Sequence, residues 1–148
     1  MRMSRIEIER VIPHAGAMCL LDGIVDLDEM RVRAVSSTHH DLHNPLRVDG
    51  RLHALSGIEY AAQAMAVHGA FSGKTTSKPR TGYLVALRYV ACSERWLDAH
   101  DGELVIEAEL QMGDGGLVIY GFAVRAGGTE ILHGQATVVL DVDRERLR

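Results

Sequence analysis

One apolar segment, residues 54–71, constrains the fold of this chain more than any other part of the sequence. It reads ALSGIEYAAQAMAVHGAF, and its alanine, methionine, leucine and glutamine residues favour an α-helix about 27 Å long. Apolar residues occupy nearly every side of this helix, which is typical of a helix that is buried on most sides. Its many small residues would let a curved sheet lie close to the helix backbone.

The segments on both sides of this helix have the patterns of β-strands. Before it, residues 18–26 and 31–37 are short apolar runs separated by Asp28 and Glu29, which predicts a hairpin. After it come four strand-like segments: residues 83–90, 103–112, 117–125 and 130–142. Two strands, one long helix and four further strands predict an α+β fold in which an antiparallel sheet wraps around the helix, the hotdog arrangement.

Length and charge narrow the possible functions. The chain has 148 residues, so we expect a single hotdog domain over residues 1–148. A formal net charge of −4 and an aromatic content of 5% argue against nucleic acid as a partner. Two cysteines, Cys19 and Cys92, are too few for a disulfide scaffold, so a cytoplasmic location is expected. The apolar segment carries Glu59, which argues against a membrane span. The sequence has no phosphate-binding glycine motif, and no cofactor is expected.

A narrow polar stripe crosses the apolar helix. Ser56, Glu59 and Gln63 fall on one face when the helix is counted by three and four. Burying a charged carboxylate costs free energy unless the group is paired. The stripe therefore either meets solvent or a neighbouring strand, or faces a cleft in which Glu59 acts as an acid or base. At the helix start, the backbone N–H groups of residues 55–57 are expected to be free to bind a carbonyl oxygen.

Histidines are concentrated just before the helix. Five of the eight precede residue 54: His14, His39, His40, His43 and His53. Residues 38–53 form an aperiodic loop, and loops of this length tend to carry function. One of His39, His40 and His43 is therefore a candidate for proton transfer beside Glu59, and the other two are expected to be surface residues. No cysteine or acidic cluster completes the H-H-x-x-H spacing, so no metal site is expected. His53 is expected to be neutral, because the helix dipole disfavours a cation at the helix start.

Motifs at the start and centre of the chain resemble a known family. Ile12-Pro13-His14 followed by Leu20-Leu21-Asp22 resembles the opening of the FabZ-type 3-hydroxyacyl-acyl-carrier-protein dehydratases. Residues 59–63, EYAAQ, resemble the E-A-M-A-Q of the hotdog helix in that family. Residues 44–47 and 57–66 are closer still to the dehydratase-like hotdog proteins of aryl polyene and xanthomonadin-type pigment clusters.

The resemblance implies a hotdog dimer that removes water from a 3-hydroxyacyl thioester carried on acyl carrier protein. In the family a histidine takes the α-proton, and a carboxylic residue on the helix of the neighbouring subunit helps to expel the hydroxyl. Glu59 matches the carboxylic position. His43-Asn44-Pro45 keeps only the H-x-P of the family pattern G-H-F-P-G, and His39 is the alternative base. We assign His14, Gly57 and Gln63 to substrate binding.

Two other functions stay open. A thioesterase on the same fold would use the helix carboxylate to activate water. A non-catalytic partner of a related, active hotdog subunit would account for the departures from the family motif. We therefore expect either a homodimer or a hetero-oligomer with a related hotdog subunit.

Overall fold

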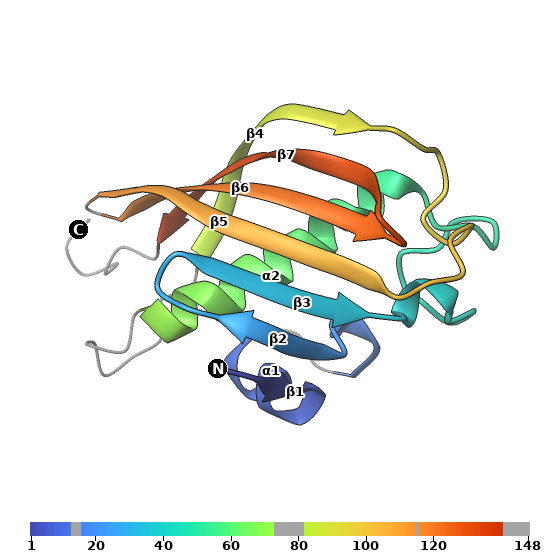
Figure 1. Cartoon of the computed structure of the whole chain (residues 1–148), viewed down its shortest axis with the longest axis horizontal. Coiled ribbons are helices and arrows are strands. Elements are labelled where there is room, and N and C mark those ends of the chain that lie inside the picture. Colours follow the sequence, from blue (N-terminus) through green and yellow to red (C-terminus); the bar gives the residue numbers. More distant parts are fainter. Residues whose placement is uncertain (13–15, 73–81, 115, 141–148) are drawn as a thin grey trace, which may run out of the picture.

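A curved antiparallel sheet and one long helix make up most of the structure, a computed structural model that describes residues 1–12, 16–72, 82–114 and 116–140 (Figure 1). The described strands are β1 (Met3–Ser4), β2 (Gly23–Leu27), β3 (Arg31–Ser36), β4 (Gly82–Cys92), β5 (Leu104–Asp114), β6 (Leu117–Ala126) and β7 (Thr129–Leu140). They form one sheet in the order β1-β2-β3-β5-β6-β7-β4. The predicted α+β hotdog fold is confirmed.

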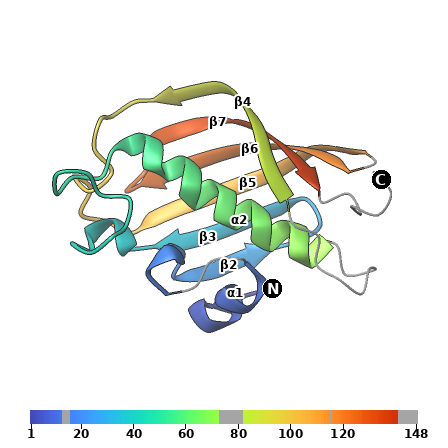
Figure 2. The same ribbon diagram turned by 180° about the vertical axis from the view of Figure 1, so that it is seen from behind.

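The helix α2 (Gly57–Ser72) lies across one face of the sheet (Figure 2). A 3-10 turn, η3 (Ala54–Ser56), leads into it, which confirms the predicted helical segment. Helix and sheet lie close together at Gly57, where a Cβ atom would lie 2.8 Å from Leu132 Cδ2 and 3.3 Å from Val124 Cγ2. The small residue at this position therefore permits the close packing that the sequence suggested. The core between the two layers is mainly aliphatic, and its largest buried residues include Ile8, Leu20, Leu21, Ile24, Leu52, Leu97, Leu104, Ile106, Ile131 and Leu132.

The sequence analysis missed the elements at the N-terminus. Strand β1 pairs with β2, and a short helix, α1 (Arg5–Val11), follows it. Ser4 caps this helix by accepting a hydrogen bond from the backbone N–H of Glu7, whose side chain bonds back to the N–H of Ser4. This capping box is visible in the sequence as Ser-x-x-Glu and could have predicted the helix start.

The first predicted strand was too long. The hairpin of β2 and β3 is confirmed, but β2 begins at Gly23 and residues 18–22 are not a strand. The reason lies in Leu20, whose backbone N–H donates to the side chain of Gln63 and whose carbonyl accepts from the hydroxyl of Ser36. These side chains satisfy the backbone N–H and carbonyl groups that a neighbouring strand would otherwise bond. Residues 141–142 of the last predicted strand lie outside the described residues.

The sheet face opposite α2 is polar. Arg31 and Arg33 on β3 reach Glu109 and Glu107 on β5, at 3.5 and 3.6 Å, and Arg125 on β6 reaches Glu107 at 3.0 Å. These residues also line a shallow groove of about 430 Å³, in which cationic and anionic side chains alternate. Exposed ion pairs contribute little stability each, so their effect is to keep this face compatible with water. Of the helices in the described part of the chain, none is long and apolar enough to cross a membrane.

His68 is buried within the core on α2. Its Nε2 donates to the carbonyl oxygen of Glu29 at 3.0 Å, so its Nδ1 accepts from the hydroxyl of Tyr120 at 2.8 Å. Burial raises the pKa of Tyr120 to about 12, and the phenol therefore remains a donor. Burial lowers the pKa of His68 below its ordinary value, because the charged imidazolium is poorly solvated there.

Acid is expected to destabilise the fold through this histidine. The unfolded chain binds a proton on His68 near pH 6.5, whereas the folded chain binds it only at lower pH. As pH falls from 6.5 toward the folded pKa, the free energy of unfolding therefore drops by at most about 1.4 kcal/mol per pH unit. Thermal unfolding between pH 7.5 and 5 checks this: Tm should fall less steeply for His68→Gln than for the wild type. Parallel profiles for the two proteins would contradict it.

Candidate active site

Glu59 and Gln63 lie one turn apart on α2, as the sequence predicted, and they are in contact. Gln63 is almost completely buried, and its Oε1 accepts from the N–H of Leu20 at 2.9 Å. Its Nε2 donates to the carbonyl oxygen of Met18 at 2.7 Å and lies 3.5 Å from Glu59 Oε1. Glu59 itself is partly exposed. Gln63 therefore ties residues 18–20 to the helix and holds an amide donor beside the Glu59 carboxylate.

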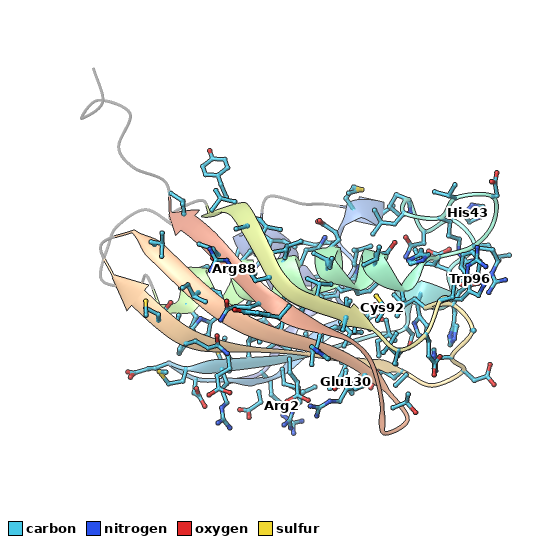
Figure 3. The ribbon with its side chains drawn as sticks, turned by 90° about the horizontal axis from the view of Figure 1, so that it is seen from above. Arg2, His43, Arg88, Cys92, Trp96 and Glu130 are labelled. Atoms are coloured by element: carbon cyan, nitrogen blue, oxygen red, sulfur yellow. The ribbon has the colours of Figure 1, made fainter. Side chains whose placement is uncertain are left out.

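The two candidate histidines have very different surroundings. His39 is completely buried, and its Nε2 donates to the carbonyl oxygen of His100 at 3.0 Å. The Nδ1 atom of His39 is buried without a hydrogen-bond partner among the described residues. Burial lowers the pKa of the His39 imidazole below its ordinary value. The side chain of His43 is exposed, at the end of the molecule where α2 begins (Figure 3). Of the two, His43 is therefore the one that a substrate could reach.

The backbone N–H groups at the helix start are not free, and that expectation was wrong. The N–H of Leu55 donates to His53 Nδ1 at 3.0 Å, and the N–H of Ser56 donates to the carbonyl oxygen of His53 at 2.9 Å. The N–H of Gly57 donates to carbonyl groups of η3. Gly57 therefore lacks the free donor on which its assignment to substrate binding rested. His53 Nδ1 is thus the acceptor that caps the turn leading into the helix.

The structure adds two residues that the sequence analysis did not select, Tyr60 and Asn44. Tyr60 is completely buried on α2, and its hydroxyl contacts Thr38 Oγ1 at 2.8 Å and Asn44 Nδ2 at 3.0 Å. Burial raises the pKa of Tyr60, so its hydroxyl keeps its proton. One signal was available: a tyrosine buried among apolar residues needs a hydrogen-bond partner, and Tyr60 is the residue after Glu59.

His14 and its neighbours, residues 13–15, lie outside the described residues, and the expected role of His14 stays a prediction. Within the described ranges, no group of three or more histidine, cysteine or acidic side chains is arranged to hold a metal ion. His40 and His39 both direct Nε2 to the carbonyl oxygen of His100. Of the candidate residues, the structure brings Glu59 and Gln63 into contact on the helix and leaves His43 exposed in the loop before it.

Solved structures similar to this chain include a dehydratase complex and a thioesterase. The dehydratase heterocomplex ApeI:P from Xenorhabdus doucetiae is 22% identical, with a TM-score of 0.79, and the match covers 95% of this chain and 94% of that chain. A thioesterase from Haemophilus influenzae is 11% identical, with a TM-score of 0.67, covering 93% and 90% of the two chains. Identities this low support the fold alone.

Sequence comparison is more specific. No curated protein matches the chain. Residues 6–147, nearly the whole chain, match the family of ApeP dehydratases. The match includes the candidate site, the helix and every described strand except β1. The chain belongs to the ApeP-like dehydratase family.

Proposed function

We propose that this chain is a subunit of a dehydratase that removes water from 3-hydroxyacyl thioesters on acyl carrier protein. One observation carries the proposal: Glu59, on the mainly apolar α2, lies 3.5 Å from an amide that the backbone of residues 18 and 20 fixes in place. The carboxyl group is oriented and still partly exposed, which a proton donor to a substrate needs. Family membership and the exposed His43 in the preceding loop support the same function.

The reaction requires one base and one acid. His43 takes the proton from the carbon next to the thioester carbonyl, and that electron pair forms the new carbon–carbon double bond. The hydroxyl group on the next carbon leaves with a proton from the Glu59 carboxyl group as water. The resemblance to FabZ-type enzymes implies that the two groups acting on one substrate come from opposite subunits. His39 is a weaker candidate, since its ring is buried against His100.

We infer that the second subunit is a related hotdog chain that pairs with β4. This strand ends the sheet, so its outer edge has no neighbour among the described strands. Its large apolar side chains are exposed: Tyr83, Leu84, Val85, Leu87 and Tyr89. An apolar edge strand is a template for pairing with another chain. The similarity to a heterocomplex favours a different hotdog subunit over a second copy.

Intact-mass analysis of a substrate-loaded carrier protein tests the reaction. We expect a 3-hydroxyacyl carrier protein to lose the mass of one water when it is incubated with this chain and a related hotdog subunit. Each protein is also assayed alone. Free acid together with unloaded carrier would identify a thioesterase instead. Water loss with the partner alone, unchanged by this chain, would contradict the proposal.

A further inference from the structure

A hydrogen bond joins the segment that carries His43 to the segment that carries Glu59. Asn44, the residue after His43, donates from Nδ2 to the hydroxyl of Tyr60, the residue after Glu59, at 3.0 Å. Both side chains are buried, Tyr60 completely and Asn44 almost completely. We propose that Tyr60 and Asn44 are positioning residues, which fix the loop backbone at His43 against the first turn of α2. The inference rests on the proposed function, because it assigns these residues to the same reaction.

The hydrogen bonds around Tyr60 have one consistent direction. The amide nitrogen of Asn44 can only donate, so the Tyr60 oxygen accepts from it. The carbonyl oxygen of Leu20 can only accept, so Thr38 Oγ1 donates to it at 2.7 Å. The Tyr60 hydroxyl must then donate to Thr38 Oγ1, at 2.8 Å. The chain of donors thus runs from Asn44 through Tyr60 and Thr38 to Leu20.

This chain of hydrogen bonds returns to the helix beside Glu59. The N–H of Leu20 donates to Gln63, whose amide nitrogen lies 3.5 Å from Glu59 Oε1. Gln63 therefore holds the N–H of Leu20 directly, and Tyr60, three residues earlier on α2, holds its carbonyl oxygen through Thr38. One buried network therefore sets both the amide beside Glu59 and the loop beside His43. Linked buried hydrogen bonds of this kind rigidify the segments that they join.

Asn44 and Asp41 also hold the loop around His43 through hydrogen bonds within the loop. Besides Tyr60, Asn44 Nδ2 donates to the carbonyl oxygen of Thr38 at 3.0 Å, and Asn44 Oδ1 accepts from the N–H of Leu46 at 2.9 Å. The N–H of His43 donates to Asp41 Oδ1 at 2.8 Å. The backbone of His43 is thus fixed on both sides while its ring is exposed. Without Tyr60, this loop would keep its internal hydrogen bonds but lose a direct bond to α2.

Replacing Tyr60 by phenylalanine removes the hydroxyl and keeps the ring. Tyr120→Phe is the matched control, since Tyr120 is also buried, also bonded through its hydroxyl at 2.8 Å, and contacts His68 in the core. In the complete heterocomplex, we expect Tyr60→Phe to lower kcat for dehydration on the order of tenfold to a hundredfold, because small displacements of reacting groups are costly. KM should change by less than about threefold, because the substitution affects the placement of the reacting groups and not uniform substrate binding. Tyr120→Phe should leave kcat unchanged.

Two further measurements separate positioning from general stability. In the double variant Asn44→Ala with Tyr60→Phe, the loss in kcat should be smaller than the product of the two single losses, because the two residues share one hydrogen bond. Amide hydrogen exchange of residues 38–47 should be faster in Tyr60→Phe than in the wild type and unchanged in Tyr120→Phe. This last measurement needs no activity.

The outcomes are distinct. Equal kcat for Tyr60→Phe and Tyr120→Phe, or additive losses in the double variant, would overturn the inference. If the wild-type complex removes no water, the proposed function fails, and hydrogen exchange still decides the structural part. Faster exchange confined to residues 38–47 in Tyr60→Phe would then support the tether, and unchanged exchange would overturn it.

Discussion

Glu59→Gln is expected to lower the rate of dehydration by roughly 100-fold to 10,000-fold, the usual contribution of a positioned acid or base. Glutamine has nearly the same shape as glutamate but cannot donate a proton to a leaving hydroxyl group. Gln63 would still hold residues 18 and 20, because those hydrogen bonds do not involve Glu59. The fold should therefore survive, and the loss should be in kcat. His43→Ala is expected to have an effect of the same order, as the base is removed.

The measurement is the rate of enoyl product formation by the heterocomplex, with Tm recorded for each variant. Glu103→Gln and His133→Ala are matched controls, since both side chains are exposed and neither residue belongs to α2 or to the loop of residues 38–53. His39→Ala offers a contrast: this ring is buried and bonded to the carbonyl oxygen of His100, so its removal should lower Tm. If Glu59→Gln and His43→Ala both keep the wild-type rate, this chain does not supply the acid or the base.

The repeating parts of the fold could be predicted from the sequence. Segments 83–90, 103–112 and 117–125 alternate or lie between turn residues, and strands β4, β5 and β6 cover all of them except residue 103. The contact between Glu59 and Gln63 follows from their spacing, because residues four apart share one face of a helix. Such features are local, and the sequence pattern contains what determines them.

The loop before the helix could not be predicted in this way. His39 is buried and His43 exposed because of contacts with residues far along the chain. His39 bonds to His100, and Arg47 lies 3.7 Å from Asp98 while donating to the carbonyl oxygen of His39 at 2.8 Å. No periodicity within residues 38–53 encodes these partners. The choice between two histidines in one loop therefore needed the tertiary structure.

The helix start shows how a correct local argument can lead to a wrong site. Exposed N–H groups at a helix start do bind oxyanions, but only where no side chain or preceding turn has already accepted them. Here His53 and the turn η3 accept the N–H groups of residues 55–57. Tyr60 shows the opposite error, since it reads as one more apolar residue of the helix. Its hydroxyl becomes informative only when the partners from residues 38 and 44 are in place.

Charged substitutions on β4 are expected to dissociate the complex with the partner subunit and thereby to abolish dehydration. Val85 and Leu87 are 57% and 40% exposed on this edge strand, and pairing with a second hotdog sheet would bury them. An unpaired carboxylate buried at such an interface costs several kcal/mol, so Val85→Glu with Leu87→Glu should raise the Kd of the complex at least roughly 100-fold. Because both side chains are exposed in the isolated chain, the variant should still fold.

Size-exclusion chromatography with light scattering measures the association, and the dehydration assay is run on the same samples. Ile6→Glu is the control: this residue of α1 is 65% exposed, beside the opposite edge of the sheet, and should leave the complex intact. If the β4 variant still forms a complex of the wild-type size, the partner binds elsewhere. If the complex dissociates while the partner alone keeps the full rate, this chain contributes nothing to the chemistry. If dissociation and loss of activity coincide, as we expect, the acid and the base have to come from the two subunits together, or the active conformation exists only in the pair.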